Sequence, residues 1–209
     1  MGESKLKRAG TYVGQQCVIE WNAVYLHPPI VETGPASAPA TGLLPTQQCL
    51  LWPDESATRA LAEALARQRS LGLAFVTLHG DLGAGKTTFA RYLLQALGVS
   101  GRIKSPTYAI VEAYDPPAFP VWHFDFYRFN DPQEWEEAGF RDIFASPGLK
   151  LAEWPQKAEG LLPQADLDIS LQTEGDCARR VTLQAYTPLG AALLQGLSDA
   201  NSGRTEGCI

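Results

Sequence analysis

The sequence predicts an α/β fold in which a mixed parallel and antiparallel sheet lies between helices. One observation is an apolar, strand-like run at 73–78 that leads through a glycine-rich loop into a helical pattern over 88–97. The other is a pair of apolar segments, 108–114 and 120–129, joined by a short turn that contains two prolines. Strands with so short a connection pair antiparallel, whereas a strand that leads into a helix favours parallel pairing. Both kinds of pairing are therefore expected in one sheet.

The first elements follow from local signals along the chain. Order is expected to begin near Leu50, and an amphipathic helix that carries Leu61 and Leu65 is expected to continue to about Ser70. The later segment 120–129 is apolar on both faces, so it is expected to lie in the centre of the sheet.

The carboxyl-terminal half continues the alternation of helices and strands. Asp131 is suited to cap a helix whose first position is a proline, and this helix is expected to stop near Gly139. Then follow a short strand over 149–153, a hairpin over 168–172 and 180–186, and a closing helix over 189–197.

Composition and charge exclude several classes of protein. The 209 residues allow one full domain, or one domain with an arm, and the net charge of −6 argues against binding nucleic acid through an overall positive field. No apolar run approaches the roughly 18 residues that a membrane span needs. The four cysteines lie far apart without a C-x-x-C pair, which excludes a zinc knuckle. A cytoplasmic protein with reduced thiols is expected.

The glycine-rich loop matches the phosphate-binding P-loop pattern G-x-x-x-x-G-K-[ST] at every fixed position. Its residues are Gly80, Asp81, Leu82, Gly83, Ala84, Gly85, Lys86, Thr87 and Thr88. Glycines let the backbone curl close to a polyphosphate, and the curl aims successive N–H groups inward beside the positive end of the next helix. Lys86 would reach the β- and γ-phosphates, and the Thr87 hydroxyl would hold magnesium.

The position of this loop between a strand and a helix predicts a nucleotide site. The alternative is a glycine-rich turn with an exposed lysine. The loop and the mixed sheet together predict a P-loop NTPase-like, three-layer fold. We accordingly divide the chain into a low-complexity, disordered arm over 1–50, a P-loop nucleotide-binding domain over 51–198 and a flexible tail over 199–209.

Two acidic residues stand where a metal-associated carboxylate is expected. Strand alternation places Asp125 on one face with His123 and Tyr127, and an acid inside so apolar a strand is costly unless it is paired or lies near a metal. Glu153 ends another apolar strand, and the carboxyl ends of strands face the ligand in nucleotide-binding sheets. The alternative for each acid is a structural salt bridge.

Spacing alone leaves two alternative roles for each of several other candidate residues. The segment 104–107 follows the P-loop helix, where it is either a switch that senses the γ-phosphate or a simple Ser-Pro turn. Trp154 could stack on a base or a partner, or belong to the core. Arg128 is either an arginine finger or a salt-bridge partner. His79 and His123 are expected to be structural.

Four segments in this order resemble the bacterial TsaE family: 80–88, 104–108, 123–128 and 153–155. The resemblance extends from about residue 52 to about residue 197. Members of that family are the ATPase subunit of the machinery that makes threonylcarbamoyladenosine at adenosine 37 of tRNA. The resemblance implies ATP and Mg²⁺ as ligands and TsaD and TsaB as protein partners. It also implies that the protein contacts tRNA only through this complex and does not bind a membrane.

The resemblance also assigns roles to residues. Lys86 binds phosphate, Asp125 is a Walker-B-like acid and Glu153 is a second metal-associated acid. The implied catalytic residues are Lys86, Asp125 and Glu153, and the implied metal ligands are Thr87, Asp125 and Glu153. The implied nucleotide contacts are residues 80–88, Thr107 of the switch, and Trp154.

Competing functions remain open at this point. A P-loop small-molecule kinase is the alternative, and it would need an acceptor pocket and an arginine-bearing lid. The sequence offers Arg91, Arg128 and Arg141 at scattered positions. A GTPase is disfavoured because the chain has neither an N-K-x-D nor a D-x-x-G motif. A non-catalytic, ATP-gated binding module is the third class.

Overall fold

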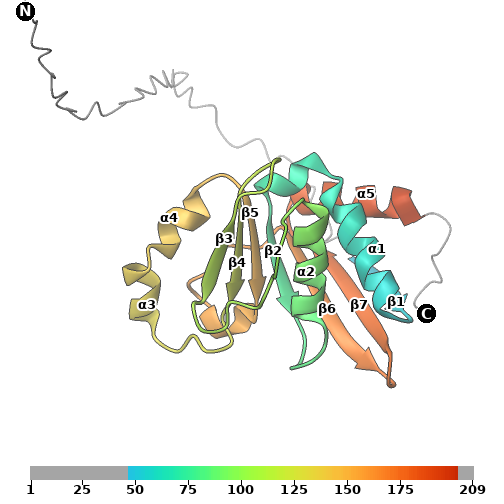
Figure 1. Ribbon diagram of the computed structural model, residues 1–209, viewed down its shortest axis with the longest axis horizontal. Coiled ribbons are helices and arrows are strands. Elements are labelled where there is room, and N and C mark those ends of the chain that lie inside the picture. Colours follow the sequence, from blue (N-terminus) through green and yellow to red (C-terminus); the bar gives the residue numbers. More distant parts are fainter. Residues whose placement is uncertain (1–46, 202–209) are drawn as a thin grey trace, which may run out of the picture. The chain divides into compact units, whose positions relative to one another are not determined.

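The structure of this chain, a computed structural model, describes residues 47–201, and every structural statement below concerns this range (Figure 1). Most of the predicted arm, and the predicted tail beyond residue 201, lie outside it. The elements extend beyond the predicted domain bounds of 51 and 198, because the first strand begins at Gln47 and the last helix ends at Asn201.

The strands are β1 Gln47–Trp52, β2 Phe75–His79, β3 Val111–Tyr114, β4 Val121–Asp125, β5 Leu149–Glu153, β6 Leu167–Glu174 and β7 Ala178–Ala185. The helices are α1 Glu55–Ala66, α2 Lys86–Ala96, α3 Pro132–Glu137, α4 Phe140–Ala145 and α5 Pro188–Asn201, with short 3₁₀ turns at η1 Arg69–Leu73 and η2 Pro155–Ala158. The predicted cap is present, because the Asp131 carboxylate accepts a hydrogen bond of 2.9 Å from the Gln133 N–H.

The strands form one seven-stranded sheet in the order β1-β7-β6-β2-β5-β4-β3. The four inner strands β6, β2, β5 and β4 run parallel to one another, so their carboxyl ends meet at one edge. The outer strands β7 and β3 pair antiparallel with their inner neighbours, and β1 pairs antiparallel with β7. The prediction of a mixed α/β sheet is therefore confirmed.

The two faces of the sheet have cores of different composition. Helices α1, α2 and α5 bury an aliphatic cluster, to which they contribute Leu65, Leu93 and Leu193. The other cluster, beneath α3 and α4, is aromatic: the rings of Phe124 and Phe140 lie 5.5 Å apart, edge to face. Aromatic pairs prefer this geometry, and their large area stabilises two helices that are only six residues long. Helices therefore cover both faces, as in a three-layer fold.

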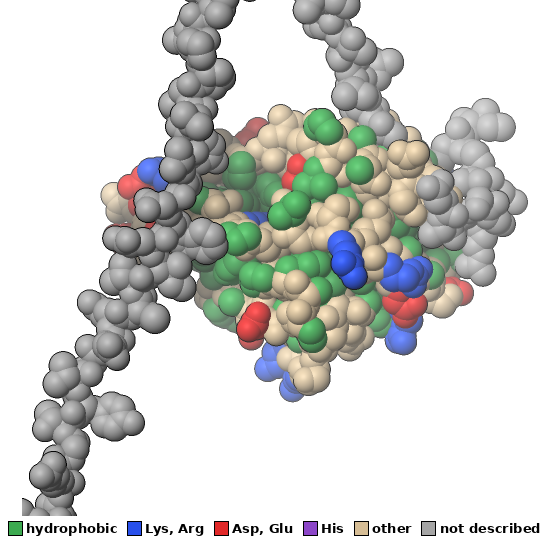
Figure 2. All heavy atoms as spheres, turned by 90° about the horizontal axis from the view of Figure 1, so that it is seen from above, with side chains coloured by type: hydrophobic (Ala, Val, Ile, Leu, Met, Phe, Trp, Pro, Cys, Tyr) green, Lys and Arg blue, Asp and Glu red, His purple; other side chains and the backbone are tan. Residues whose placement is uncertain are grey.

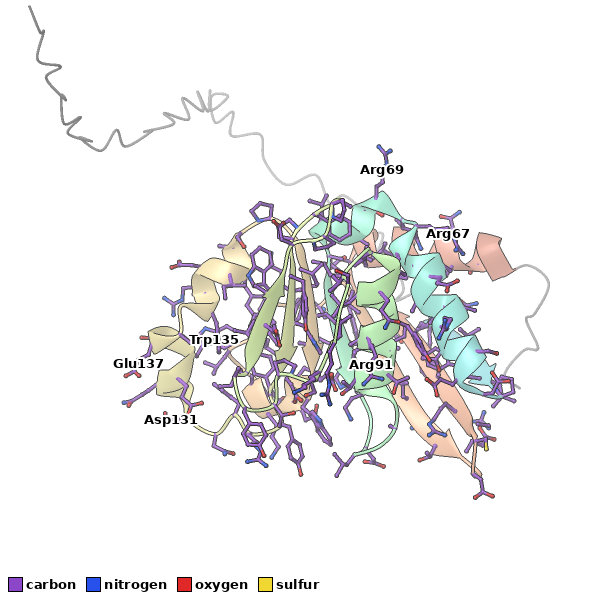
Figure 3. The ribbon with its side chains drawn as sticks, viewed as in Figure 1. Arg67, Arg69, Arg91, Asp131, Trp135 and Glu137 are labelled. Carbon is purple, nitrogen blue, oxygen red and sulfur yellow. The ribbon has the colours of Figure 1, made fainter. Side chains whose placement is uncertain are left out.

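Helix α3 shows how this aromatic layer separates core from solvent. In Figure 3, Trp135 points from α3 toward the sheet, whereas Asp131 and Glu137 point outward. Trp135 is 4% exposed. The acidic side of α3 is therefore solvated, and the tryptophan fixes the helix to the sheet.

Some boundaries predicted from local pattern were wrong. Helix α1 ends at Ala66 rather than near Ser70, and the turn η1 follows it. The segment 108–110 is a turn rather than the start of β3, and β4 stops at Asp125. Strand β4 has a neighbour on each side, but it lies next to the edge strand β3 and not at the centre of the sheet. The aromatic cluster beneath α3 and α4 covers one face of β4. Both faces of this strand are therefore buried, which explains why both are apolar.

Charge is dispersed on one end of the molecule. Figure 2 shows the face seen from above Figure 1, where few Lys, Arg, Asp and Glu side chains are visible among the described residues and opposite charges adjoin. This face has no broad field of one sign where the described residues are visible. Within residues 47–201, no helix is both long enough and apolar enough to cross a membrane.

Candidate functional site

The loop after β2 has the backbone that its glycines predict. Gly80, Gly83 and Gly85 have φ angles of 135°, 84° and 111°, in the region that favours glycine. A Cβ atom at Gly80 would lie 2.3 Å from the carbonyl oxygen of Leu171 in β6. The loop therefore both curls and packs against β6 at a distance that no side chain would allow.

Lys86 begins α2 and points back into the loop. Its Nζ donates hydrogen bonds to the carbonyl oxygens of Gly80 at 2.7 Å and Asp81 at 2.8 Å. The side chain is 4% exposed, and this burial lowers the pKa of Lys86, although the negative charges of Glu153 and Asp125 oppose the shift. An ammonium held this way inside the loop suits a phosphate, whose charge would restore its usual pKa.

Glu153, at the end of β5, is a buried carboxylate with both oxygens hydrogen-bonded. Its Oε2 accepts from the Thr87 hydroxyl at 2.8 Å, and its Oε1 lies 2.9 Å from Nε2 of His123. Glu153 is 2% exposed and His123 is fully buried. An ionised carboxylate only accepts, so Nε2 of His123 carries the hydrogen. Two donors from different elements therefore fix the position of the acid beside the loop.

Asp125 ends β4 directly beside Glu153, its register partner on β5. Its Oδ1 accepts from the Tyr127 N–H at 3.0 Å, and its Oδ2 accepts from the Thr107 hydroxyl at 2.6 Å. The Ser105 hydroxyl donates to the same Oδ2. Asp125 is 3% exposed, so both carboxylates are buried at the carboxyl edge where the loop lies.

The predicted switch segment is therefore attached to the site through Asp125. It ends in a turn in which the Ile110 N–H donates to the Pro106 carbonyl at 2.7 Å. Ile110 has a φ of 64°, a conformation that costs a β-branched residue on the order of 1–2 kcal/mol. Strain of this kind persists only where surrounding contacts enforce it, and it favours rearrangement when those contacts change.

Trp154 follows Glu153 and lies at the site rather than in either core centre. Lys86 Nζ lies 3.9 Å from the centroid of the Trp154 ring, a cation–π contact. The Tyr127 ring packs on it with centroids 5.1 Å apart. Trp154 itself has a φ of 57°, which turns the chain sharply after the strand. The structure places the Trp154 ring against Lys86, and its stacking on a base or a partner stays a prediction.

Other candidate residues do not converge on the loop. Arg128 lies over the Tyr108 ring, 4.4 Å from its centroid, and it makes no salt bridge within residues 47–201. Arg141 pairs with Glu136 at 3.2 Å on the surface. Leu82 is 77% exposed at the outside of the loop, and Thr88 lies within the first turn of α2.

A cationic hollow adjoins the switch segment. Its volume is about 500 Å³, and its lining includes Arg91, Arg102, Lys104 and Ser105. A larger depression of about 860 Å³ lies away from the loop, between α3, α4 and the segment that follows η2. Of these two, only the cationic hollow shares a residue with the site described above.

The sequence analysis did not identify two residues that contact the site. His123 was expected to be structural, but it contacts Glu153 directly, and its place on the Asp125 face of the strand was the available signal. Arg179 in β7 donates from Nε to the Ala84 carbonyl at 2.9 Å. No motif or spacing points to Arg179, because its partner is 95 residues away in sequence.

The donor set suits magnesium better than a tightly caged metal. No group of three or more His, Cys, Asp or Glu side chains that could hold a metal occurs within residues 47–201. Magnesium in phosphate sites binds through one or two carboxylates together with substrate phosphates and waters. Thr87, Asp125 and Glu153 fit that pattern, since they supply one hydroxyl and two carboxylates next to the loop.

Comparisons with known proteins find relatives of this chain in sequence and in structure. A family model described as threonylcarbamoyl adenosine biosynthesis protein TsaE matches residues 52–181. A tRNA threonylcarbamoyladenosine biosynthesis protein TsaE from Haemophilus influenzae is 41% identical over 68% of this chain and 89% of its own length. The protein of that name from Bacillus subtilis is 38% identical over 61% of this chain and 79% of its own length. The solved structure of Bacillus subtilis YdiB matches with a TM-score of 0.64 and 29% identity, over 76% of this chain and 98% of that one.

Proposed function

The chain belongs to the TsaE family of tRNA threonylcarbamoyladenosine biosynthesis proteins, and on this premise we propose that it binds and hydrolyses ATP with Mg²⁺. The observation that carries the proposal is the convergence of Lys86, Asp125 and Glu153 at one edge of the sheet, around a complete P-loop. Buried ionisable groups gathered at one edge of a sheet are typical of functional sites.

The first task of the proposed site is to bind polyphosphate. Lys86 would exchange its two carbonyl partners for phosphate oxygens, which form stronger, charge-assisted hydrogen bonds. The N–H groups of the loop and the first turn of α2 would bind the same oxygens. Magnesium, when bound, would neutralise charge on the phosphates, and Thr87, Asp125 and Glu153 are the residues that would hold it.

The second task is to orient the attacking water and respond to the γ-phosphate. Glu153 is fixed by His123 and Thr87, so its carboxylate could hold a water or a metal ligand in a constant place. Asp125 links to Ser105 and Thr107, so a change at this acid would move the switch segment, and a change in the switch would move the acid.

We further propose that the protein acts in the cytoplasm with TsaB and TsaD and reaches tRNA through them. Docking of these partners would order the segment 105–107 around the γ-phosphate and raise the rate of hydrolysis. The net charge of −6 supports tRNA contact through partners rather than through this chain alone.

The alternative is a small-molecule kinase, and one observation favours it. The cationic hollow lined by Arg91, Arg102 and Lys104 adjoins the switch, and it could hold an anionic phosphate acceptor. A kinase transfers the γ-phosphate to that acceptor, whereas an ATPase releases it as inorganic phosphate.

One experiment separates these functions. ADP and inorganic phosphate are measured for the purified protein alone, with TsaB and TsaD, and with candidate anionic acceptors. We expect slow turnover alone, equal release of ADP and phosphate, and a clear stimulation by TsaB and TsaD. ADP release without phosphate, dependent on an acceptor, would establish the kinase instead. Fast turnover that ignores both partners would contradict the proposed partnership.

A further inference from the structure

The hairpin β6–β7 supports the P-loop from the side that carries none of the sequence motifs. Leu171 of β6 approaches the loop at both ends: its carbonyl oxygen lies 2.3 Å from an ideal Cβ position at Gly80, and its Cδ2 lies 3.8 Å from that at Gly85. Between these two points, Arg179 of β7 donates from Nε to the Ala84 carbonyl at 2.9 Å. The hairpin therefore contacts the loop where it begins, in its middle and where α2 starts.

Arg179 is itself held in place. Its Nη1 donates to the Ala178 carbonyl at 2.8 Å, and its backbone pairs with Trp52 of β1 and Thr173 of β6. A guanidinium that uses two donors on two carbonyls has little freedom to turn away. The Ala84 carbonyl is consequently attached to the sheet and not only to neighbouring loop residues.

The geometry of the peptide bond gives this contact a consequence for the ligand. The Ala84 carbonyl and the Gly85 N–H belong to one planar trans peptide, so they point in opposite directions. This peptide can turn only about ψ of Ala84 and φ of Gly85, and Gly85, which has a φ of 111° and no Cβ atom, opposes that rotation little. A carbonyl fixed toward Arg179 therefore fixes the Gly85 N–H on the opposite side.

We propose that Arg179 is a positioning residue of the nucleotide site: by holding the Ala84 carbonyl, it keeps the Gly85 N–H directed at the phosphates. The inference rests on the proposed nucleotide binding and adds to it a residue outside the P-loop, the switch and the two acids. Arg179 contacts the loop, and the loop contacts the ligand. A loop that is already oriented loses less conformational entropy when it binds phosphate.

The test measures ADP binding by calorimetry on the full chain and KM and kcat for ATP. Arg179→Ala should weaken ADP binding roughly tenfold, the effect of losing one hydrogen bond with a charged donor. KM should rise by a similar factor with kcat changed less than about threefold, since the N–H binds ground state and transition state alike. Arg179→Lys, which keeps a charged donor, should recover part of the affinity.

Arg180→Ala is the matched control. Arg180 is the next residue in β7, is exposed, and pairs with Glu174 at 2.8 Å, so its removal deletes the same charge and leaves the loop untouched. Affinity in this variant should stay within twofold of wild type. Equal losses in the Arg179 and Arg180 variants would mean that only overall charge matters, and would overturn the proposal.

The remaining outcomes are also decisive. Normal ADP affinity in Arg179→Ala, or a fall in kcat with KM unchanged, would overturn the positioning role. If Arg179→Ala fails to fold, Arg179→Lys decides, because unchanged affinity there would exclude a dependence on the two-carbonyl geometry. Lys86→Ala serves in the same assay: normal ADP binding by that variant would refute the nucleotide site itself, and not only the role of Arg179.

Discussion

The two sides of strand β2 support the P-loop in different ways. On one side, β5 and β4 end in Glu153 and Asp125, whose buried carboxylates lie beside the loop. On the other side, β6 and β7 contact the loop through a leucine backbone and an arginine that binds a carbonyl. The first side offers charge to a ligand, whereas the second side holds only protein backbone.

The difference teaches that a site has two kinds of requirement. A buried carboxylate loses hydration, so it must be compensated by donors such as those from Thr87, His123 and Thr107. A contact to backbone needs no such compensation and can be made by an ordinary strand. The predictions below test whether the two sides really separate into chemistry and support.

The largest effect is expected at the residue between the two sides. Lys86→Ala should abolish ATP hydrolysis and weaken ATP binding by at least about a hundredfold, because it removes a charged phosphate ligand. The melting temperature has to be measured beside activity, because the substitution also removes the hydrogen bonds from Lys86 to the Gly80 and Asp81 carbonyls. Calorimetry, a phosphate-release assay and thermal denaturation check this. Arg67→Ala is the control, since Arg67 lies at the far end of α1 (Figure 3). Normal ATPase activity in Lys86→Ala would refute the proposed nucleotide site.

A large effect confined to turnover is expected on the β5 side. Glu153→Gln keeps the shape of the side chain but removes its charge, so kcat should fall about a hundredfold while ADP affinity changes less than about threefold. Steady-state kinetics and calorimetry measure the two quantities. The exposed Glu137→Gln variant is the control (Figure 3). Equal losses of affinity and turnover would indicate that Glu153 is a structural acid. The β5 side would then support the loop, as the β6 side does, and would not carry chemistry.

A moderate effect is expected from the residue that orients Glu153. His123→Asn removes the hydrogen bond to Glu153 Oε1, and kcat should fall roughly tenfold because the acid gains freedom. A kcat loss in His123→Asn that persists in the Glu153→Gln background would show that the two residues act independently. Thermal denaturation must accompany the kinetics, since His123 is fully buried.

The smallest effect is expected on the β6 side, and on stability alone. Burial would raise the pKa of Asp168, but hydrogen bonds from His79 and Thr77 outweigh it and hold that pKa below its usual range. A depressed carboxyl pKa stabilises the fold above the unfolded-state value of about 3.9, and this contribution disappears as pH falls through the folded-state value. Asp168→Asn should therefore cost about 1 kcal/mol of unfolding free energy at pH 7, with the difference shrinking below about pH 4.

Urea denaturation at several pH values measures that difference. ATPase activity should stay near wild type, because Asp168 bonds to Thr77 and pairs with His79 at 3.4 Å, both in β2 rather than in the loop. A strong loss of activity would show that this side also carries chemistry.

The sequence predicts the chemical side of this comparison far better than the supporting side. The P-loop residues adjoin one another in sequence, Glu153 stands at the end of a recognisable apolar strand, and Asp125 is an acid within another apolar segment. Arg179 could not be found this way, because its role depends on a contact that only the folded hairpin creates. Likewise β1 was placed too late, since residues 47–50 gain their strand structure from pairing with β7.

The aromatic layer limits prediction for a different physical reason. Helix α4 is a six-residue element that follows Gly139, too short for periodicity to reveal. Its stability comes from Phe140 and Phe144 against the sheet, which is a tertiary effect. Local pattern therefore located the elements that carry the motifs and missed one that packing alone maintains.

The contact between Lys86 and Trp154 places an indole fluorophore at the site. Indole emission depends on the charge and polarity next to the ring, and here a cation lies 3.9 Å from its centroid. If Lys86 turns to a phosphate as proposed, the electric field at that indole would change, so nucleotide binding should alter the emission of Trp154 without an attached dye.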